Sequence, residues 1–194
     1  MKLSVIIPVY NQEDLILKAI KSIPPLEDIE IIVIDDCSTD DTLEVIRTYQ
    51  YYSPQNIVIL HNSENMGVGF SVNKGLDNAQ GEYIVLLGSD DYFIDLLVLD
   101  ELDGTDLIYF DLQINDGSVW KLTPETKKGF CGSTKFMRRE FIGETRNPEV
   151  RQGEDFYFYD ALLLKKPTEK YLNRVLKHYN YPREGSLTWN ANHK

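Results

Sequence analysis

Two adjacent carboxylates, Asp90 and Asp91, follow a short apolar segment at residues 83–87 after one glycine and one serine. The residue types of the segment predict a buried strand that carries the two carboxylates at its carboxyl end. Open α/β sheets bind ligands at that edge. Because adjacent carboxylates repel each other, we expect a cation or several hydrogen-bond donors there. Hard oxygen ligands suit Mg²⁺ or Mn²⁺ shared with substrate phosphates. The alternative is a solvated turn at the end of the strand.

A second carboxylate pair, Asp35 and Asp36, follows another apolar segment. Four short apolar segments fit buried strands, at residues 3–8, 30–34, 57–60 and 83–87. Three segments with apolar residues at helical spacing lie between them, at residues 15–23, 43–49 and 68–79. This alternation predicts a mostly parallel α/β sheet with helices on both faces. Because parallel strands end at the same edge, both carboxylate pairs are expected to converge on one cleft.

Weaker sequence patterns predict a helix cap and the elements of the second half of the chain. Ser38 and Asp41 have the spacing of a capping box at the start of the second helix. Four weaker patterns follow: a short helix near 96–102, a hairpin of 107–110 and 118–120 with its turn at 115–117, a helix at 156–164, and a strand at 175–181. Residues 121–150 show no clear pattern.

The composition is that of a globular protein with one domain. Of the 194 residues, 42% are hydrophobic and 26% are charged. No apolar run approaches the ~20 residues of a membrane helix. The first strand is predicted almost at the amino terminus, so we expect no signal peptide and a cytoplasmic location. Cys37 and Cys131 are far apart and predict reduced thiols, and His61, His178 and His193 are too scattered to suggest a metal site.

The charge is distributed unevenly along the chain. The net charge of −11 argues against a nucleic-acid partner, because such a surface repels phosphates. Residues 1–120 hold 5 Lys and Arg against 22 Asp and Glu, whereas residues 121–194 hold 15 against 9. This asymmetry predicts a basic face for an anionic partner. The alternative is that the basic residues pair with the acidic half and leave no such face.

Five blocks of the sequence, in order, resemble those of the family-two glycosyltransferases. The blocks lie at residues 4–11, 33–42, 65–75, 79–84 and 89–91. A later segment, Gly153, Glu154 and Asp155, is similar to the Glu-Asp motif of that family. The resemblance covers about residues 3–93 well and about 130–188 loosely. Five blocks in order are far more specific than any one of them.

The resemblance implies a GT-A fold in a single domain, residues 1–194. About residues 1–93 would bind the nucleotide sugar and about 94–194 the acceptor. It implies an inverting transfer of a sugar from a UDP-sugar donor to a hydroxyl of a saccharide or lipid-linked acceptor, assisted by Mn²⁺ or Mg²⁺.

The resemblance also implies five contacts with the nucleotide sugar. Pro8 and Tyr10 would line the pocket of the base, and Asp36 would accept a hydrogen bond from uracil N3–H. Asp90 would bind the ribose. Arg183 belongs to a segment at residues 183–187 that is similar to the carboxyl-terminal segment of the family, where a basic residue meets the diphosphate. The alternative for Arg183 is a solvated turn.

The resemblance implies that two further carboxylates take part in the reaction. Asp91 would hold the metal on the diphosphate, and Asp155 would be the catalytic base. A single carboxylate suffices to deprotonate the acceptor hydroxyl, whereas a retaining covalent mechanism would use a second one. The aromatic residues 156–158 could exclude water from Asp155. The alternative for Asp155 is a helix N-cap.

The chain departs from the family pattern at several positions. Val72 stands where the family often has arginine, and Gly69 and Phe70 replace a small pair. The motif is Ser-Asp-Asp and not Asp-x-Asp, which leaves Asp91 as the expected direct ligand. An alternative function is therefore a nucleotide-sugar-binding module, or a partner-dependent subunit without turnover of its own. A nucleotidyltransferase is disfavoured, because residues 9–12 lack the Gly-rich basic loop of that class.

Basic residues between the metal motif and Asp155 would face the acceptor in a GT-A arrangement. They predict an anionic acceptor, or peripheral contact with anionic lipid at the inner membrane face. These residues are Lys127, Lys128, Lys135, Arg138, Arg139, Arg146 and Arg151.

Overall fold

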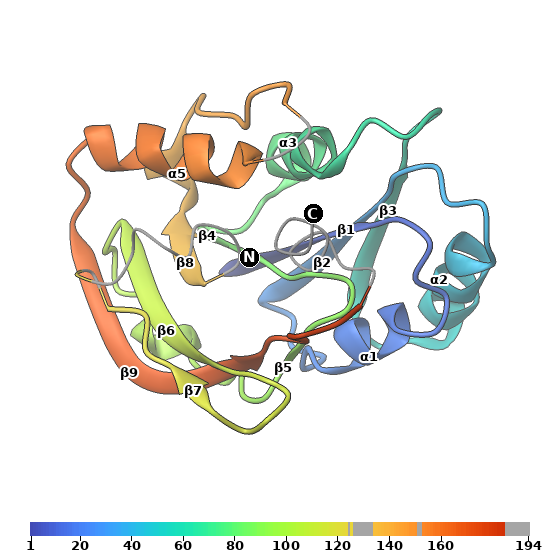
Figure 1. Cartoon of the computed structure of the whole chain (residues 1–194), viewed down its shortest axis with the longest axis horizontal. Helices are drawn as coiled ribbons and strands as arrows, with labels where there is room; N and C mark the ends of the chain where they lie inside the picture. The colour runs from blue at the N-terminus through green and yellow to red at the C-terminus, as the bar shows by residue number, and fades with distance from the viewer. Residues whose placement is uncertain (124, 126–133, 151–152, 185–194) are drawn as a thin grey trace.

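The computed structural model describes residues 1–123, 125, 134–150 and 153–184, and its centre is a curled mixed sheet (Figure 1). The strand order is β3-β2-β1-β4-β8-β6-β9-β5, with β7 paired to β6. The first half of the chain contains the strands β1 (Leu3–Val9), β2 (Ile29–Asp35), β3 (Asn56–His61) and β4 (Tyr83–Leu86) and the helices α1 (Ile16–Lys21), α2 (Thr42–Tyr52) and α3 (Val68–Asn78).

The four strands of this half are parallel, as predicted. β1 lies between β2 and β4, and β3 lies outside β2. Every residue of β2 is buried, as is nearly all of β1. Central parallel strands are covered on both faces and are therefore apolar throughout, which is why their residues read as continuous hydrophobic runs.

Helices cover both faces of this sheet, which confirms the predicted layering (Figure 1). Alternate residues of β1 point to opposite faces. Val5 and Ile7 join a core with α1 and Ile46 of α2, whereas Ile6 joins a second core with α3 and α5. α3 approaches the sheet so closely that a Cβ on Gly75 would lie 2.5 Å from Ile6 Cγ2.

The second half of the chain extends the sheet and curls it. Its elements are β5 (Tyr92–Phe93), the 3₁₀ turn η1 (Leu99–Glu101), β6 (Leu107–Gln113), β7 (Val119–Trp120), β8 (Lys135–Arg138), α4 (Arg139–Ile142), α5 (Glu154–Leu164) and β9 (Glu169–His178). β8 runs antiparallel between β4 and β6 and joins the two halves. β9 is parallel to β6 and antiparallel to β5. The end of β9 therefore returns to the segment that follows Asp91.

Several predicted elements differ in detail. The hairpin is confirmed, and its turn contains Gly117 with φ +84°. The helix predicted near 96–102 is only the turn η1, and β9 begins six residues earlier than predicted, because its first half pairs with β6. The capping box does not form, since the Asp40 carboxylate accepts the Thr42 N–H instead. Among the described residues, no helix has the length and apolarity needed to cross a membrane.

Candidate functional site

The two carboxylate pairs lie at the same edge of the sheet. β2 and β4 both flank β1, so the loops that follow these strands lie on either side of the end of β1. Asp36 and Asp90 belong to these two loops, and Tyr10 follows β1 between them with 43% of its surface exposed. The predicted convergence of the carboxylate pairs on one region is therefore confirmed.

Hydrogen bonds lock the loop after β1 to the loop after β2. Asn11, with φ +49°, donates its backbone N–H to Ser38 Oγ over 3.0 Å. Its side-chain Oδ1 accepts the Thr39 N–H over 2.8 Å. Asn11 needs both an acceptor side chain and a tolerance of positive φ, which few residue types combine. No local sequence pattern signals this role of Asn11.

The Asp36 carboxylate is buried and holds the start of α3. Its Oδ1 accepts hydrogen bonds from Asn62 Nδ2 (2.7 Å) and the Met66 N–H (2.9 Å), and its Oδ2 accepts one from the Gly67 N–H (2.8 Å). A carboxylate offers about four acceptor positions. Among the described residues, one acceptor position on Oδ2 has no donor.

Its neighbour Asp35 has a structural role. The side chain is fully buried, and Oδ2 lies 2.8 Å from His61 Nδ1 on the adjacent strand β3. The two carboxylates of this pair thus point to different partners, and only Asp36 holds the loop that leads into α3.

The Asp90 carboxylate is only partly buried and contacts Arg183. Arg183 Nε donates to Asp90 Oδ2 over 2.9 Å, and 19% of the Asp90 side chain is exposed. Burial raises the pKa of the Asp90 carboxyl, and the charge of Asp91 raises it further, against the opposing effect of Arg183. Additional positive charge at this position would therefore be stabilised. The structure brings together Asp90 and Arg183, 93 residues apart.

Asp91 lies in a different environment from Asp90. It is 3% exposed, its Oδ2 lies 2.9 Å from the ammonium of Lys177, and its Oδ1 accepts the Asn180 N–H over 2.9 Å. Lys177 is itself only 1% exposed. This buried ion pair attaches the end of β9 to β5. Lys177 and Asn180 together occupy one acceptor position on each Asp91 oxygen, which leaves Asp90 as the more exposed carboxylate of the pair. The direct metal contact of Asp91 stays a prediction.

The geometry at Asp90 fits a cation that shares its ligands with a substrate. Within the described ranges, no three His, Cys, Asp or Glu side chains are grouped to hold a metal. Mg²⁺ and Mn²⁺ in phosphate sites commonly take one or two carboxylates and complete their shell with phosphate oxygens and water. Asp90 can supply one such oxygen ligand.

Asp155 is the second residue of α5 and not its N-cap. Gly153 occupies the N-cap position with φ +74°. The Asp155 Oδ1 accepts the N–H of the next residue, Phe156, over 2.9 Å. The alternative interpretation as an N-cap is therefore wrong. Glu154 is the titratable group that sequence analysis missed: burial raises the pKa of its carboxyl, and the charge of Asp155 raises it further.

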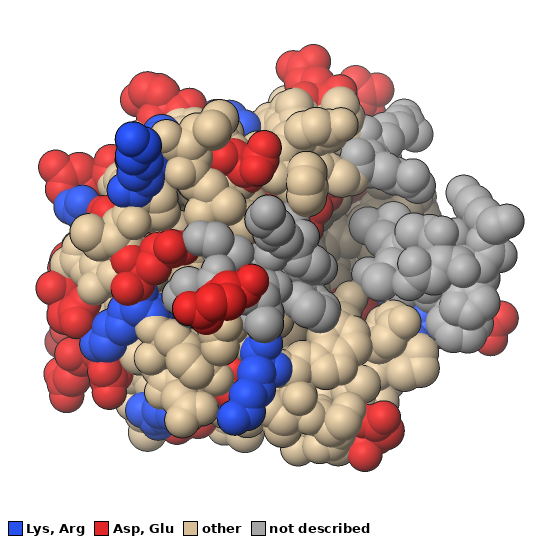
Figure 2. Space-filling view, turned by 60° about the vertical axis from the view of Figure 1, so that its left-hand side comes forward, with Lys and Arg blue, Asp and Glu red and all other residues tan. Residues whose placement is uncertain are grey.

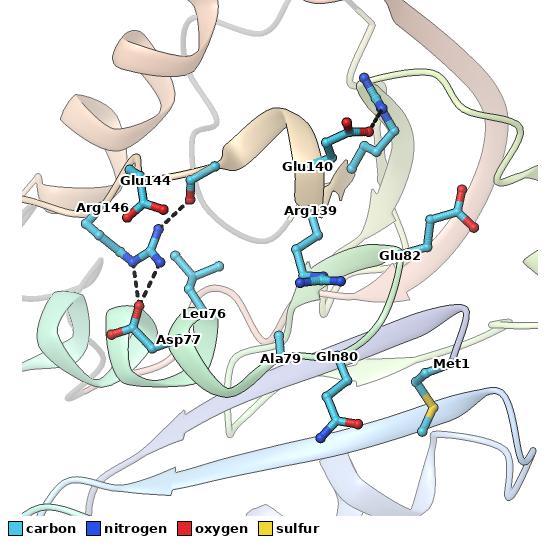
Figure 3. A pocket seen from close by; sticks show the side chains of 12 residues that line it. Met1, Leu76, Asp77, Ala79, Gln80, Glu82, Arg139, Glu140, Glu144 and Arg146 are labelled. Atoms are coloured by element: carbon cyan, nitrogen blue, oxygen red, sulfur yellow. Dashed lines mark hydrogen bonds and ion pairs between the residues drawn. The ribbon is translucent and has the colours of Figure 1, made fainter.

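A cavity of about 750 Å³ lies at the opposite edge of the sheet (Figure 3). Met1, at the start of β1, and Glu82, just before β4, help to line it. Arg146 at its wall donates to Asp77 Oδ1, as Figure 3 shows. Arg139 donates its Nε to the Gly81 carbonyl. The arginines around the cavity are thus away from the acidic edge and face the acidic half of the chain.

The predicted basic face is not formed by the described residues. Arg138 binds Asp106 and Glu140, and Lys135 is buried with its ammonium 3.9 Å from the ring centre of Tyr159. Figure 2 likewise shows Lys and Arg interspersed with Asp and Glu on the face in view. Arg138 and Arg146 therefore pair with carboxylates of the acidic half, as the alternative interpretation expects. Outside the described residues lie Lys127, Lys128, Cys131, Arg151, residues 185–187 and His193.

Comparison with solved structures supports the fold. The chain aligns with TarS of Staphylococcus aureus, residues 1–349, solved in complex with UDP-GlcNAc, at a TM-score of 0.83 and 25% identity, over 96% of this chain and 60% of that one. It also aligns with the mannosyltransferase PcManGT of Pyrobaculum calidifontis, in complex with GDP-Man and Mn²⁺, at a TM-score of 0.73 and 17% identity, over 97% of this chain and 59% of that one.

Relatives are also found by sequence. A GalNAc(5)-diNAcBac-PP-undecaprenol beta-1,3-glucosyltransferase of Campylobacter jejuni is 29% identical over 98% of this chain and 68% of that protein. A poly(ribitol-phosphate) beta-glucosyltransferase of Bacillus spizizenii is 42% identical over 47% of this chain. The matched segment spans only 15% of that protein. The family model described as glycosyl transferase family 2 matches residues 4–101. Together with the GT-A fold and the acidic edge, this match shows that the chain belongs to glycosyl transferase family 2.

Proposed function

We propose that the chain transfers a sugar, with inversion, from a UDP-sugar to a hydroxyl of a saccharide or lipid-linked acceptor. The observation that carries this proposal is the position of Asp36 and Asp90 on either side of the end of β1. The first can read a base and the second can meet a charged diphosphate. The UDP-GlcNAc bound to TarS supports a uridine donor.

The nucleotide would occupy the loops that follow β1, β2 and β4. Uracil carries an N3–H donor, which fits the acceptor position left on Asp36 Oδ2. Pro8 and the exposed ring of Tyr10 would line the base pocket. Arg183 would move its guanidinium from Asp90 to the diphosphate, where a fork of N–H donors suits phosphate oxygens.

Asp90, as the more exposed carboxylate of the pair, would hold a divalent cation on the diphosphate. Such a cation, when bound, neutralises the charge that develops on the leaving diphosphate. Asp91 would support this arrangement through its ion pair with Lys177, which anchors the segment that carries Arg183. The Mn²⁺ in the complex of PcManGT supports a metal-assisted reaction in this fold.

Asp155 would accept the proton of the acceptor hydroxyl as the oxygen attacks the anomeric carbon. The bond from that carbon to the diphosphate breaks as the new glycosidic bond forms, and the single displacement inverts the configuration. Phe156 and Tyr157, both largely exposed at the start of α5, would contact the acceptor. The names of relatives support an acceptor built of sugars on a lipid diphosphate or a poly(ribitol-phosphate) chain.

A donor screen tests this proposal. UDP-glucose, UDP-GlcNAc and GDP-mannose are incubated with the protein and Mn²⁺ or EDTA, and nucleotide release is measured. We expect UDP release that depends on Mn²⁺ and that Asp155→Asn lowers by about 10²–10⁴-fold at unchanged UDP affinity. UDP binding without release would support the alternative of a binding module or partner-dependent subunit. Failure to bind any uridine nucleotide would refute the proposed donor.

A further inference from the structure

The amide side chain of Asn73 holds the segment that leads into α5. Asn73 Nδ2 donates to the Asn147 carbonyl over 2.9 Å, and its Oδ1 accepts both the Asn147 N–H (2.8 Å) and Asn147 Nδ2 (3.1 Å). Asn147 is only 6% exposed. A single side chain on α3 therefore satisfies both backbone groups of a buried residue 74 positions later.

The same two helices also touch at their starts (Figure 1). A Cβ on Gly69, in the first turn of α3, would lie 2.9 Å from Glu154 Cγ and 3.4 Å from Asn147 Cβ. Glycine at this position lets the start of α5 approach α3. The departure from the family pattern at Gly69 thus has a structural reason in this chain, because Glu154 fills the space that a side chain would need.

These contacts connect the donor-side and acceptor-side carboxylates through one rigid element. Asp36 holds the Gly67 N–H at the N-cap of α3. About one and a half turns into that helix, Asn73 holds Asn147, and the helix that carries Asp155 begins seven residues after Asn147. Asp36 and Asp155 are therefore both placed relative to α3.

We propose that Asn73 is a positioning residue that fixes Asp155 relative to the bound donor. This inference rests on the proposed function of Asp155 as the base. Asparagine offers a donor and an acceptor in one plane, and both are needed to bind the N–H and the C=O of one residue. Proton transfer demands that the base lie within hydrogen-bond reach of the hydroxyl, and a misplacement of about 1 Å can cost about 10²-fold in rate.

Asn73→Ala tests this inference, with Asn78→Ala as the matched control. Asn78 lies on the same helix, and its side-chain Nδ2 donates a hydrogen bond, over 2.8 Å, to the Lys74 carbonyl within α3. We expect Asn73→Ala to lower kcat for UDP release from UDP-glucose or UDP-GlcNAc by about tenfold or more, with an unchanged Kd for UDP by calorimetry. Asn147→Ala, which removes one of the three bonds, should have a smaller effect. Asn78→Ala should change neither value.

Hydrogen exchange supplies a readout that does not need turnover. Asn73→Ala should speed exchange of the Asn147 N–H and of the first turn of α5, whereas Asn78→Ala should not. Equal exchange in both variants would overturn the inference. So would a loss of UDP affinity that matches the loss of kcat, because Asn73 would then act on the nucleotide half.

A double variant separates this inference from the proposed function. If Asn73 acts through Asp155, adding Asn73→Ala to Asp155→Asn should lower kcat little further, because groups that act as a unit are not additive. Full additivity would refute the positioning role. If Asp155→Asn alone keeps normal turnover, the assignment of the base fails. If Asp155→Asn is inactive and Asn73→Ala is normal, only the positioning role fails.

Discussion

Asp91→Asn should lower stability and keep the response to metal, whereas Asp90→Asn should keep stability and lose that response. Asp91→Asn removes the negative charge that lies 2.9 Å from the Lys177 ammonium, which is 1% exposed. Removing one member of a buried ion pair typically costs about 3–5 kcal/mol. A change of 1 kcal/mol shifts the Tm of a domain of this size by about 2–4 °C. We therefore expect the Tm of Asp91→Asn to fall by roughly 6–20 °C.

Asp90→Asn should leave stability nearly unchanged. Its partner Arg183 is 27% exposed, and partly solvated ion pairs of this kind contribute about 0–1 kcal/mol. The amide also relieves the repulsion from Asp91 and the burial of a charge, the two causes that raise the pKa of Asp90. The loss and the gain are of similar size, so the net change in the free energy of unfolding should stay within about 1 kcal/mol.

The functional effects should be reversed between the two variants. Thermal unfolding gives the Tm, and calorimetry of UDP with Mn²⁺ or EDTA gives the contribution of the metal to UDP affinity. Asp90→Asn should abolish that contribution, whereas the folded fraction of Asp91→Asn should keep it. A stable Asp91→Asn protein that has lost its response to Mn²⁺ would refute this reasoning and restore Asp91 as the metal ligand.

Three further outcomes are expected. Gly69→Ala should lower kcat with little loss of Tm, because the new Cβ displaces Glu154 while alanine favours the helix by up to about 1 kcal/mol; normal turnover would show that this contact tolerates a side chain. Asp36→Ala should cost about 1–3 kcal/mol in chemical denaturation, since the buried amide of Asn62 then keeps Ser71 Oγ but loses its second acceptor. The same variant should abolish UDP binding by calorimetry. The free energy of unfolding should fall as the pH rises through the titration of Asp90. Because folding raises the pKa of Asp90 above the ordinary 3.8, the folded chain holds this proton to a higher pH than the unfolded chain. The stability that Asp90 contributes is therefore complete below pH 3.8 and is lost as the pH rises through the raised pKa. The difference in Tm between the wild type and Asp90→Asn across that range measures this contribution, and a constant difference would contradict it.

The parallel half of the sheet could be predicted from sequence because its signals are local. The apolar runs of β1 and β2 and the helical spacing of α3 are each contained in a single segment. The alternation of these segments leaves few arrangements other than a parallel sheet. That topology alone places Asp36 and Asp90 at one edge.

The second half was harder to predict because its pairings connect distant segments. The first residues of β9 alternate poorly and become a strand through pairing with β6, some 60 residues earlier. The turn η1 has the apolar spacing of a helix, but its segment stays largely irregular. Local propensity is a weak guide where tertiary pairing decides the conformation.

The sequence by itself determined that acidic side chains lie at or shortly after the ends of β2 and β4, since each pair follows an apolar run within a few residues. Only the tertiary structure decided which of two adjacent carboxylates is the more exposed. Asp90 and Asp91 are chemically identical and one residue apart, but successive side chains point in different directions. Asp91 meets Lys177 from β9, 86 residues away, and is buried, whereas Asp90 meets Arg183 at the surface. No local pattern encodes that difference, because it depends on where the sheet curls back.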